Sequence, residues 1–110
     1  MACMNTSTEL LQDGELRHRR DARGVHWLTL SSPATFNALG ESMLQTLQQA
    51  IERVAADGAA RAVVLGAEGK AFCAGHNLKE MKAHPELAYY QQLFAQCTRM
   101  MMALRKLPVP

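Results

Sequence analysis

Two short segments near the start of the chain have the pattern of β-strands. In residues 25–31, apolar side chains alternate with polar ones at Val25 and Trp27, and the segment is rich in strand-forming residues. The charged segment 15–21 precedes them and predicts an exposed edge strand. Gly24 lies between the two segments as a turn residue, so together they predict a β-hairpin.

The pattern then changes to the period of an amphipathic helix. From Met43 to Ala55, apolar residues recur at spacings of three and four. Gly40 is the expected N-cap, and Gly58 predicts a left-handed stop at the other end. A second long helix is expected to start near Pro85, because proline suits a first helical position.

A continuous apolar run separates the two helices. Residues 62–65 read Ala-Val-Val-Leu, which is typical of a strand covered on both faces. The loop 66–75 after it is rich in glycine and alanine, and Asn77 is expected to cap a short helix. The order strand, strand, helix, strand, helix predicts an α/β fold with a crossover connection.

Composition places the chain among ordinary globular proteins. It has 110 residues, 48% hydrophobic and 20% charged, with a formal net charge of +2. This balance favours no nucleic-acid or membrane partner, and no apolar run reaches the roughly 18 residues of a membrane span. Residues 1–13 have no period and are expected to be a flexible lead-in to one unit, 14–110.

Cysteine usage and the N-terminus indicate the compartment. Cys3, Cys73 and Cys97 are scattered, with no CxxC pair, so neither a disulfide framework nor a zinc site is expected. The N-terminus lacks the basic and apolar regions of a secretory signal and carries early acidic residues. The expected location is therefore cytoplasmic.

The turn after the apolar strand carries the sharpest candidate chemistry. Residues 69–78 lead from a buried strand through small residues into a helix, and such a turn leaves backbone N–H groups unpaired. These donors suit an anion or the oxygen of an enolate, and Gly75 would let a ligand approach the backbone closely. An ordinary strand-to-helix turn has the same pattern. A phosphate-binding loop is excluded by the glycine spacing.

The histidine and cysteine side chains give weaker evidence for a functional site than this turn does. His76 has no second ligand at a suitable spacing, and His18, His26 and His84 are isolated, so structural roles are expected and no metal site is predicted. Cys73 is expected to fill a small buried space rather than to act as a nucleophile.

Four motifs together resemble the N-terminal part of the crotonase superfamily, the enoyl-CoA hydratase/isomerase family. They are Val25–Leu30 with Pro33 and Phe36–Leu39, the helix opening at Met43, Arg61–Gly66 leading to Lys70–Met81, and Leu107–Pro110. The branch with the greatest likeness is named enoyl-CoA hydratase domain-containing protein 3, with its bacterial relatives. The resemblance implies a crotonase-like (ClpP/crotonase) α/β fold, a spiral of ββα units. Residues 14–110 are expected to be the N-terminal fragment of such a domain.

The resemblance also implies where an acyl-CoA thioester would bind. The backbone N–H of His76 corresponds to one donor of the family's oxyanion hole. The residues matching the family's acyl-CoA site are Ala34, Phe36, Ala74, Gly75, His76, Asn77 and Leu78. Ala34 stands where the family often has a basic residue, and Asn77 where it usually has aspartate.

The implied activity is that of a lyase (a hydratase) or an isomerase of fatty-acid and acyl-CoA metabolism. No separate cofactor is expected, since coenzyme A is part of the substrate. In the family, the second oxyanion donor and two catalytic glutamates correspond to positions after Pro110, so the 110 residues are expected to be an incomplete, inactive fragment. The full-length form is expected to be a trimer or hexamer. Alternatives are a non-catalytic module that docks on full-length crotonase subunits, and another enolate reaction such as decarboxylation.

Overall fold

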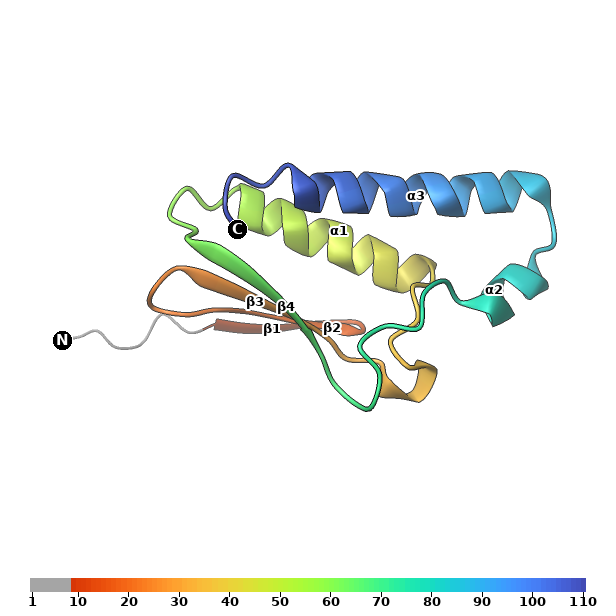
Figure 1. The fold of residues 1–110 in the computed structure, drawn as a ribbon, viewed down its shortest axis with the longest axis horizontal. Coiled ribbons are helices and arrows are strands. Elements are labelled where there is room, and N and C mark those ends of the chain that lie inside the picture. Colours follow the sequence, from red (N-terminus) through yellow and green to blue (C-terminus); the bar gives the residue numbers. More distant parts are fainter. Residues whose placement is uncertain (1–8) are drawn as a thin grey trace.

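A four-stranded sheet and two long helices on one of its faces make up the protein (Figure 1). The computed structural model describes residues 9–110. The strands are β1 (Glu9–Asp13), β2 (Leu16–Arg20), β3 (Val25–Leu30) and β4 (Ala62–Ala67). The helices are η1 (Pro33–Thr35), α1 (Glu41–Ala55), α2 (Leu78–Ala83) and α3 (Leu87–Arg105). The predicted strands and helices are confirmed, and β1 is an additional strand.

The first strand corrects two predictions. Residues 9–13, expected in a flexible lead-in, form β1 and pair antiparallel with β2, while residues 1–8 lie outside the described part. Pairing through main-chain groups needs no hydrophobic period, which is why the pattern missed it. Because β1 covers the outer side of β2, that strand is interior rather than at the edge, and Leu16 and His18 are buried in it.

The β2–β3 hairpin is closed by a tight turn at residues 21–24. The carboxylate of Asp21 accepts hydrogen bonds from the backbone N–H groups of Arg23 (2.9 Å) and Val25 (3.1 Å). Gly24 has a φ of +87°, and a Cβ there would lie 2.7 Å from the carbonyl oxygen of Ala59. Only glycine meets both conditions without strain, so the sequence pattern located this turn correctly.

The strand β4 pairs in parallel with β3 and forms the open edge of the sheet. The prediction that both its faces are covered is wrong: Val64 is 39% exposed, because the helices cover one face only. At one point the edge is capped, where the backbone N–H of Val63 donates to the carbonyl of Pro110 (2.9 Å).

The helix α1 lies against the sheet, and α3 lies along α1 (Figure 1). Gly40 is the N-cap of α1, as predicted. Gly58 is not its left-handed stop, because the helix ends in right-handed geometry at Ala56. Helix α3 begins at Leu87 with Glu86 as N-cap, so Pro85 lies before the helix rather than at its first position.

Candidate functional site

Two loops at one end of the sheet lie side by side and build the candidate site. The first runs from β3 through η1 to α1, and the second runs from β4 to α2. The backbone N–H of Leu39 donates to the carbonyl of Gly75 (2.6 Å), and that of Ala74 donates to the carbonyl of Phe36 (3.0 Å). These bonds bring together residues 36 and 38 positions apart in the sequence, from the two segments that form the predicted acyl-CoA site.

Asn37 fixes the first loop to the second. Its side chain is fully buried, and its Nδ2 donates to the carbonyls of Glu68 (2.9 Å) and Ala71 (3.0 Å). Its Oδ1 accepts from the backbone N–H of Ser32 (2.8 Å). The residue has a φ of +55°, a conformation that asparagine tolerates better than most residues. Sequence reasoning gave Asn37 no role of its own, although its place in the Phe36–Leu39 motif was a signal.

The backbone N–H of His76 is not used by the fold of the described part of the chain. Within residues 9–110, its N–H donates no hydrogen bond, since the bridge between Leu39 and His76 uses the flanking carbonyl of Gly75. Gly75 has a φ of +87°, and a Cβ there would meet open space. Glycine is therefore required here by the backbone conformation. Helix α2 has only 6 residues, so its dipole adds little at this donor.

A cleft of about 320 Å³ lies between the two loops. It is lined by Ala34, Thr35, Ala38, Ala74, His76, Asn77, Leu78 and Lys79. Five of the predicted acyl-CoA residues are in this lining. Phe36 and Gly75 are not: the Phe36 side chain is 55% exposed beside the cleft, and Gly75 contributes backbone geometry. Lys79 was missed, because an isolated lysine has no pattern in the sequence.

The side chain of His76 has surroundings that differ from those of its amide. Its ring packs against Phe94 of α3, with centroids 5.2 Å apart. Its Nδ1 is buried and has no hydrogen-bond partner in the described chain. A neighbouring hollow of about 350 Å³ is lined by His76, Phe94, Cys97, Thr98, Met101 and Met102. In the described chain the imidazole therefore has an aromatic packing contact and no carboxylate or other polar partner that would orient it as a base.

Behind these loops lies a small cavity of about 90 Å³ with only apolar side chains. Its lining includes Phe72, Cys73, Met100 and Met101. Cys73 is half-buried and packs against the core, as predicted. Burial raises the pKa of the Cys97 thiol, which argues against a nucleophile there. Cys3 lies outside the described residues. Among the residues that the structure describes, no group of three or more histidine, cysteine or carboxylate side chains could hold a metal ion.

Asn77 and Glu80 hold the second loop against α1. The Oδ1 of Asn77 accepts from the backbone N–H of Glu80 (3.1 Å), so the predicted N-cap is confirmed. The Glu80 carboxylate accepts from the backbone N–H of Glu41 (2.8 Å) at the start of α1. The single proton of the Tyr89 hydroxyl is shared between the carboxylates of Glu41 (3.1 Å) and Glu80 (3.3 Å). Partial burial and these carboxylates raise the pKa of Tyr89 to about 12.

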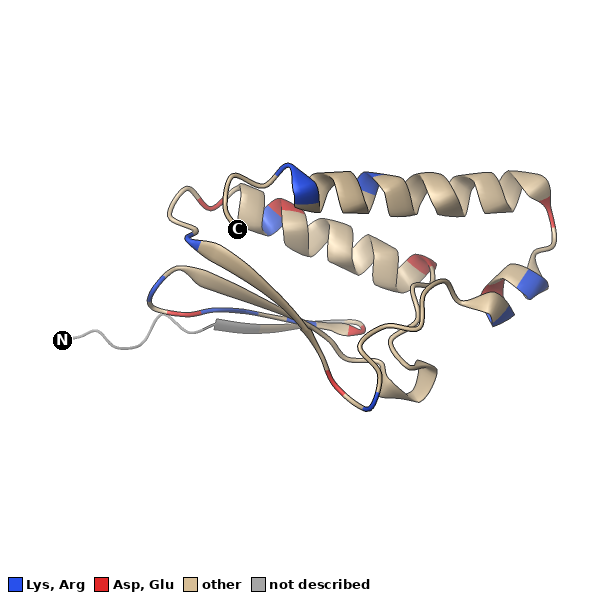
Figure 2. Cartoon of the chain, in the orientation of Figure 1, with Lys and Arg blue, Asp and Glu red and all other residues tan. Residues whose placement is uncertain are grey.

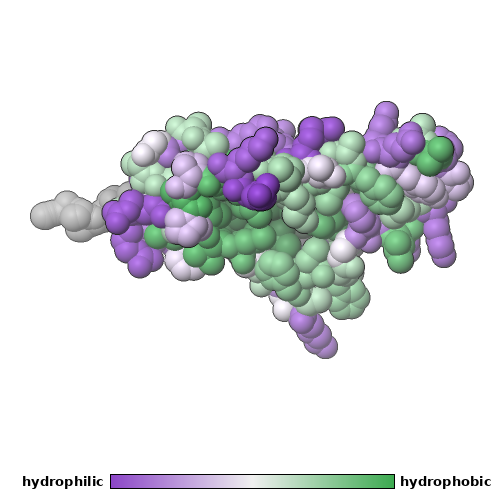
Figure 3. Space-filling model, turned by 45° about the horizontal axis from the view of Figure 1, so that its top comes forward, coloured by the Kyte–Doolittle hydropathy of each residue, from purple (hydrophilic) through white to green (hydrophobic). Residues whose placement is uncertain are grey.

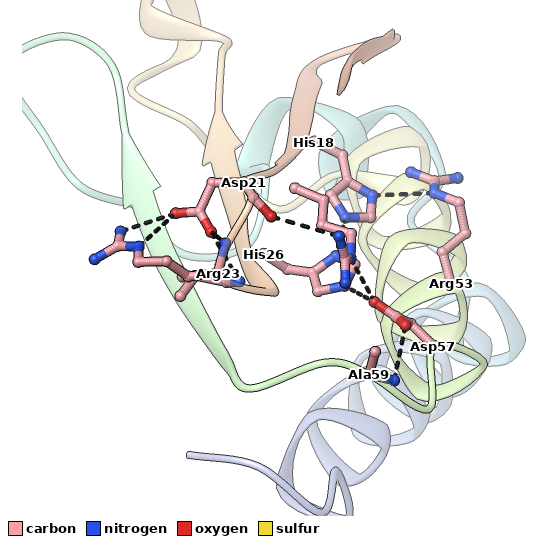
Figure 4. Close-up of polar contacts among 9 residues, drawn as sticks. His18, Asp21, Arg23, His26, Arg53, Asp57 and Ala59 are labelled. Carbon is pink, nitrogen blue, oxygen red and sulfur yellow. Dashed lines mark hydrogen bonds and ion pairs between the residues drawn. The ribbon is translucent and has the colours of Figure 1, made fainter. Parts of the chain in front are cut away.

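A second polar cluster, distant from the cleft, was not predicted. His18 and His26, interpreted as isolated, are hydrogen-bonded to each other at 2.8 Å between Nε2 and Nδ1 (Figure 4). The hairpin register pairs His18 with Leu28 and Arg20 with His26, so the two histidines are diagonal neighbours on one face. Combining the predicted turn with its register would have found this pair.

The fold and the paired loops define a class of protein. An enoyl-CoA hydratase structure from Mycobacterium smegmatis has a TM-score of 0.86 at 55% identity, covering 87% of this chain and 37% of that one. The structure of human enoyl-CoA hydratase domain-containing protein 3 has a TM-score of 0.76 at 30% identity, covering 96% and 38%. The protein therefore has the crotonase fold, as predicted, and corresponds to its N-terminal part.

The sequence comparison gives the family. The profile described as Enoyl-CoA hydratase/isomerase matches residues 20–110. Mitochondrial enoyl-CoA hydratase domain-containing protein 3 from Xenopus laevis is 36% identical over 104 residues, 94% of this chain and 35% of that protein. The chain belongs to the enoyl-CoA hydratase/isomerase family. It spans about a third of the length of the curated relatives it matches. No helix within residues 9–110 is long and apolar enough to cross a membrane.

Proposed function

We propose that these residues bind an acyl-CoA thioester in the cleft between η1 and the turn 74–78. The thioester carbonyl accepts a hydrogen bond from the backbone N–H of His76. The observation that carries this proposal is the open amide of His76 at a cleft lined by Ala34, Ala74 and Asn77. An unpaired backbone donor at a preformed cleft is the element that oxyanion stabilisation needs.

The chemistry assigned to this donor is polarisation of the carbonyl. When a proton leaves the carbon next to a thioester, negative charge moves to the carbonyl oxygen. A fixed N–H aimed at that oxygen stabilises the resulting enolate, and losing one such donor typically costs about 10²–10³ in rate. The second donor and the acid and base groups correspond, by family resemblance, to positions after Pro110. These residues are therefore assigned binding and polarisation but no proton transfer.

Polar groups at the mouth of the cleft suit the CoA end of the ligand. The Lys79 ammonium offers a positive charge to phosphate groups, at a cleft where Ala34 offers none. The Asn77 side chain is committed to capping α2 and contributes mainly through the position it gives the turn. The apolar cavity and the hollow beside Phe94 provide surfaces for an acyl chain.

The experiment is calorimetric titration of the protein with crotonyl-CoA and with a long-chain acyl-CoA. Because an amide cannot be removed by side-chain mutation, Gly75→Ala is the test variant: it strains the φ of +87° next to the donor. We expect it to weaken binding roughly tenfold, since this strain costs about 1–2 kcal/mol. His76→Ala keeps the amide and removes only the ring, which lines the cleft and the hollow beside Phe94, so any loss of affinity in this variant measures the contribution of the side chain.

Gly66→Ala is the matched control, because a Cβ there meets open space and the residue has no positive φ. It should leave affinity within about twofold. If the wild-type protein binds no acyl-CoA, the proposal fails. If Gly66→Ala weakens binding as much as Gly75→Ala does, the His76 amide is not the contact.

A second candidate function, docking on full-length crotonase subunits without catalysis, is favoured by one observation. Helix α3 exposes the apolar side chains of Phe94 (46%), Met101 (48%) and Met102 (36%). Figure 3 shows apolar side chains gathered across the middle of the molecule. Sedimentation of the protein alone and mixed with a full-length family member separates the two functions. The docking function predicts a complex that contains both this protein and the full-length family member. Acyl-CoA binding by a trimer or hexamer predicts no such mixed complex.

A further inference from the structure

The hydrogen bonds around His18 and His26 form a chain with one possible direction. Arg53 Nε, which always carries a proton, donates to Nδ1 of His18 (3.1 Å). That nitrogen is therefore bare, so the proton of His18 is on Nε2 and is donated to Nδ1 of His26. His26 in turn carries its proton on Nε2 and donates it to Oδ2 of Asp57 (2.7 Å). Both histidines are thus neutral, and both are Nε2–H tautomers.

The chain connects three separate parts of the fold (Figure 4). His18 is on β2, His26 is on β3, Arg53 is in the last turn of α1 and Asp57 follows that helix. Both imidazoles are nearly inaccessible, with 6% and 4% of their residue surface exposed. These contacts fasten the hairpin to the C-terminal end of α1.

The other groups around the histidines keep the carboxylate ionised. Arg20 of β2 donates from Nε to Oδ2 of Asp57 (2.8 Å), and the backbone N–H of Ala59 donates to Oδ1 (2.9 Å). These bonds hold the pKa of Asp57 well below its usual range. From β1, Leu11 borders the same hollow, and Glu9 stands opposite Arg20 in the strand register.

Neither imidazole can take up an additional proton without the loss of a hydrogen bond in this chain of side chains. On His18 it would put an N–H on Nδ1, facing the N–H of Arg53. On His26 it would put an N–H on Nδ1, facing the N–H of His18. His18 can accept a hydrogen bond from that N–H only if its own proton moves from Nε2 to Nδ1. Nδ1 can then no longer accept from Arg53, and that hydrogen bond is lost. Each arrangement loses one hydrogen bond between buried groups.

We propose that the Arg53–His18–His26–Asp57 chain is a pH-sensitive clamp. It holds the β2–β3 hairpin against the end of α1 at neutral pH and releases that contact when one proton enters in acid. The clamp is separate from the acyl-CoA cleft and independent of the function proposed for it.

The direction of the pH effect follows from His18. Burial, with the neighbouring charge of Arg53, lowers its pKa to about 4 from an ordinary value near 6.5. Between these two pH values His18 is protonated in the unfolded chain and neutral in the folded chain. The contribution of His18 to stability is therefore complete above about pH 6.5, decreases as the pH falls through this window, and levels off below about pH 4. Asp57 ordinarily titrates below this window.

Nuclear magnetic resonance of the imidazole nitrogens at pH 7.5 tests the clamp in the unmodified protein. Both His18 and His26 should show a protonated Nε2 and a bare Nδ1. Amide hydrogen exchange at pH 7.5 and pH 5, corrected for intrinsic rates, tests the release. We expect amides of residues 52–57 to exchange at least tenfold faster at pH 5, while those of residues 44–47 change less than threefold. An Nδ1–H tautomer at either histidine, or equal changes in both segments, would overturn the proposal.

Two variants distinguish the loss of stability caused by protonation of the clamp from the loss that acid causes elsewhere in the protein. His18→Gln removes the titrating group, so the urea midpoint should lose most of its decrease between pH 7 and pH 4.5. His84→Gln is the control, since His84 is exposed and stacks on Tyr89 outside the chain. It should keep the wild-type decrease. An unchanged pH profile in His18→Gln contradicts the clamp. If that variant does not fold, the tautomers and the exchange rates of the wild-type protein still decide.

Discussion

The two long helices of this protein run side by side and differ in how much they bury. Helix α1 has 15 residues and buries seven of them, whereas α3 has 19 residues and buries only Leu93 and Met100. The sheet packs on one side of α1 and α3 on the other, so α1 is covered from both directions (Figure 1). Helix α3 has α1 as its main neighbour, yet carries few charges between its ends (Figure 2).

The region that stabilises the fold is therefore different from the region that carries the candidate binding site. The packing between α1 and the hairpin supplies most of the core. The turn at Gly75, one wall of the cleft and most of the exposed large apolar side chains lie toward β4, α2 and α3. Segments with few buried contacts are where ligand-binding groups can remain accessible. Substitutions on the two sides should therefore affect different measurements.

The largest expected contrast is between two leucines, one on each helix. Leu44 of α1 is fully buried and Leu87 of α3 is 71% exposed. Leu44→Ala should lower the free energy of unfolding by about 3 kcal/mol, because it removes buried methyl groups and leaves a cavity. Leu87→Ala should change it by less than about 0.5 kcal/mol. Urea unfolding followed by circular dichroism measures both, and similar losses would show that α3 is packed as tightly as α1.

A somewhat smaller effect is expected at Asn37, which joins the two regions. Asn37→Ala removes three hydrogen bonds and puts alanine, which adopts a positive φ less readily than asparagine, at a φ of +55°. The unfolding free energy should fall by about 2 kcal/mol, and acyl-CoA affinity should fall with it. Asn37→Gly keeps the backbone conformation without strain. If it restores full stability, the loss came from φ rather than from the hydrogen bonds.

The smallest effect is expected at Asn77, on the functional side. Asn77→Ala removes the cap of α2 and should cost about 1 kcal/mol. Asn77→Asp keeps an accepting oxygen and adds a charge suited to the first turn, so its stability should match the wild type. Thermal unfolding compares the two. A loss in the aspartate variant equal to that in the alanine variant would mean that the amide N–H₂, rather than the capping oxygen, is the stabilising group.

Local patterns in the sequence predicted the elements well where one face of an element is apolar. The period of residues 43–55 specified α1, and the strand-forming residues around Trp27 specified β3. The family resemblance indicated five residues of the cleft lining, and the glycine at position 75 fits the left-handed backbone conformation found there. Strand β1 and the buried side of β2 were missed, since a polar strand is stabilised by its neighbour's main chain.

The sequence alone determined most of the helix and strand segments, the turn at Gly24 and the family of the protein, because these depend on short-range periods and on motifs of adjacent residues. Tertiary structure decided the relations between distant residues. It brought Asn37 against the loop after β4, placed Lys79 at the cleft and lined up Arg53, His18, His26 and Asp57. Hydrogen bonds and burial depend on where chains cross in space, and histidines that look isolated along a chain become neighbours only once the strands have paired.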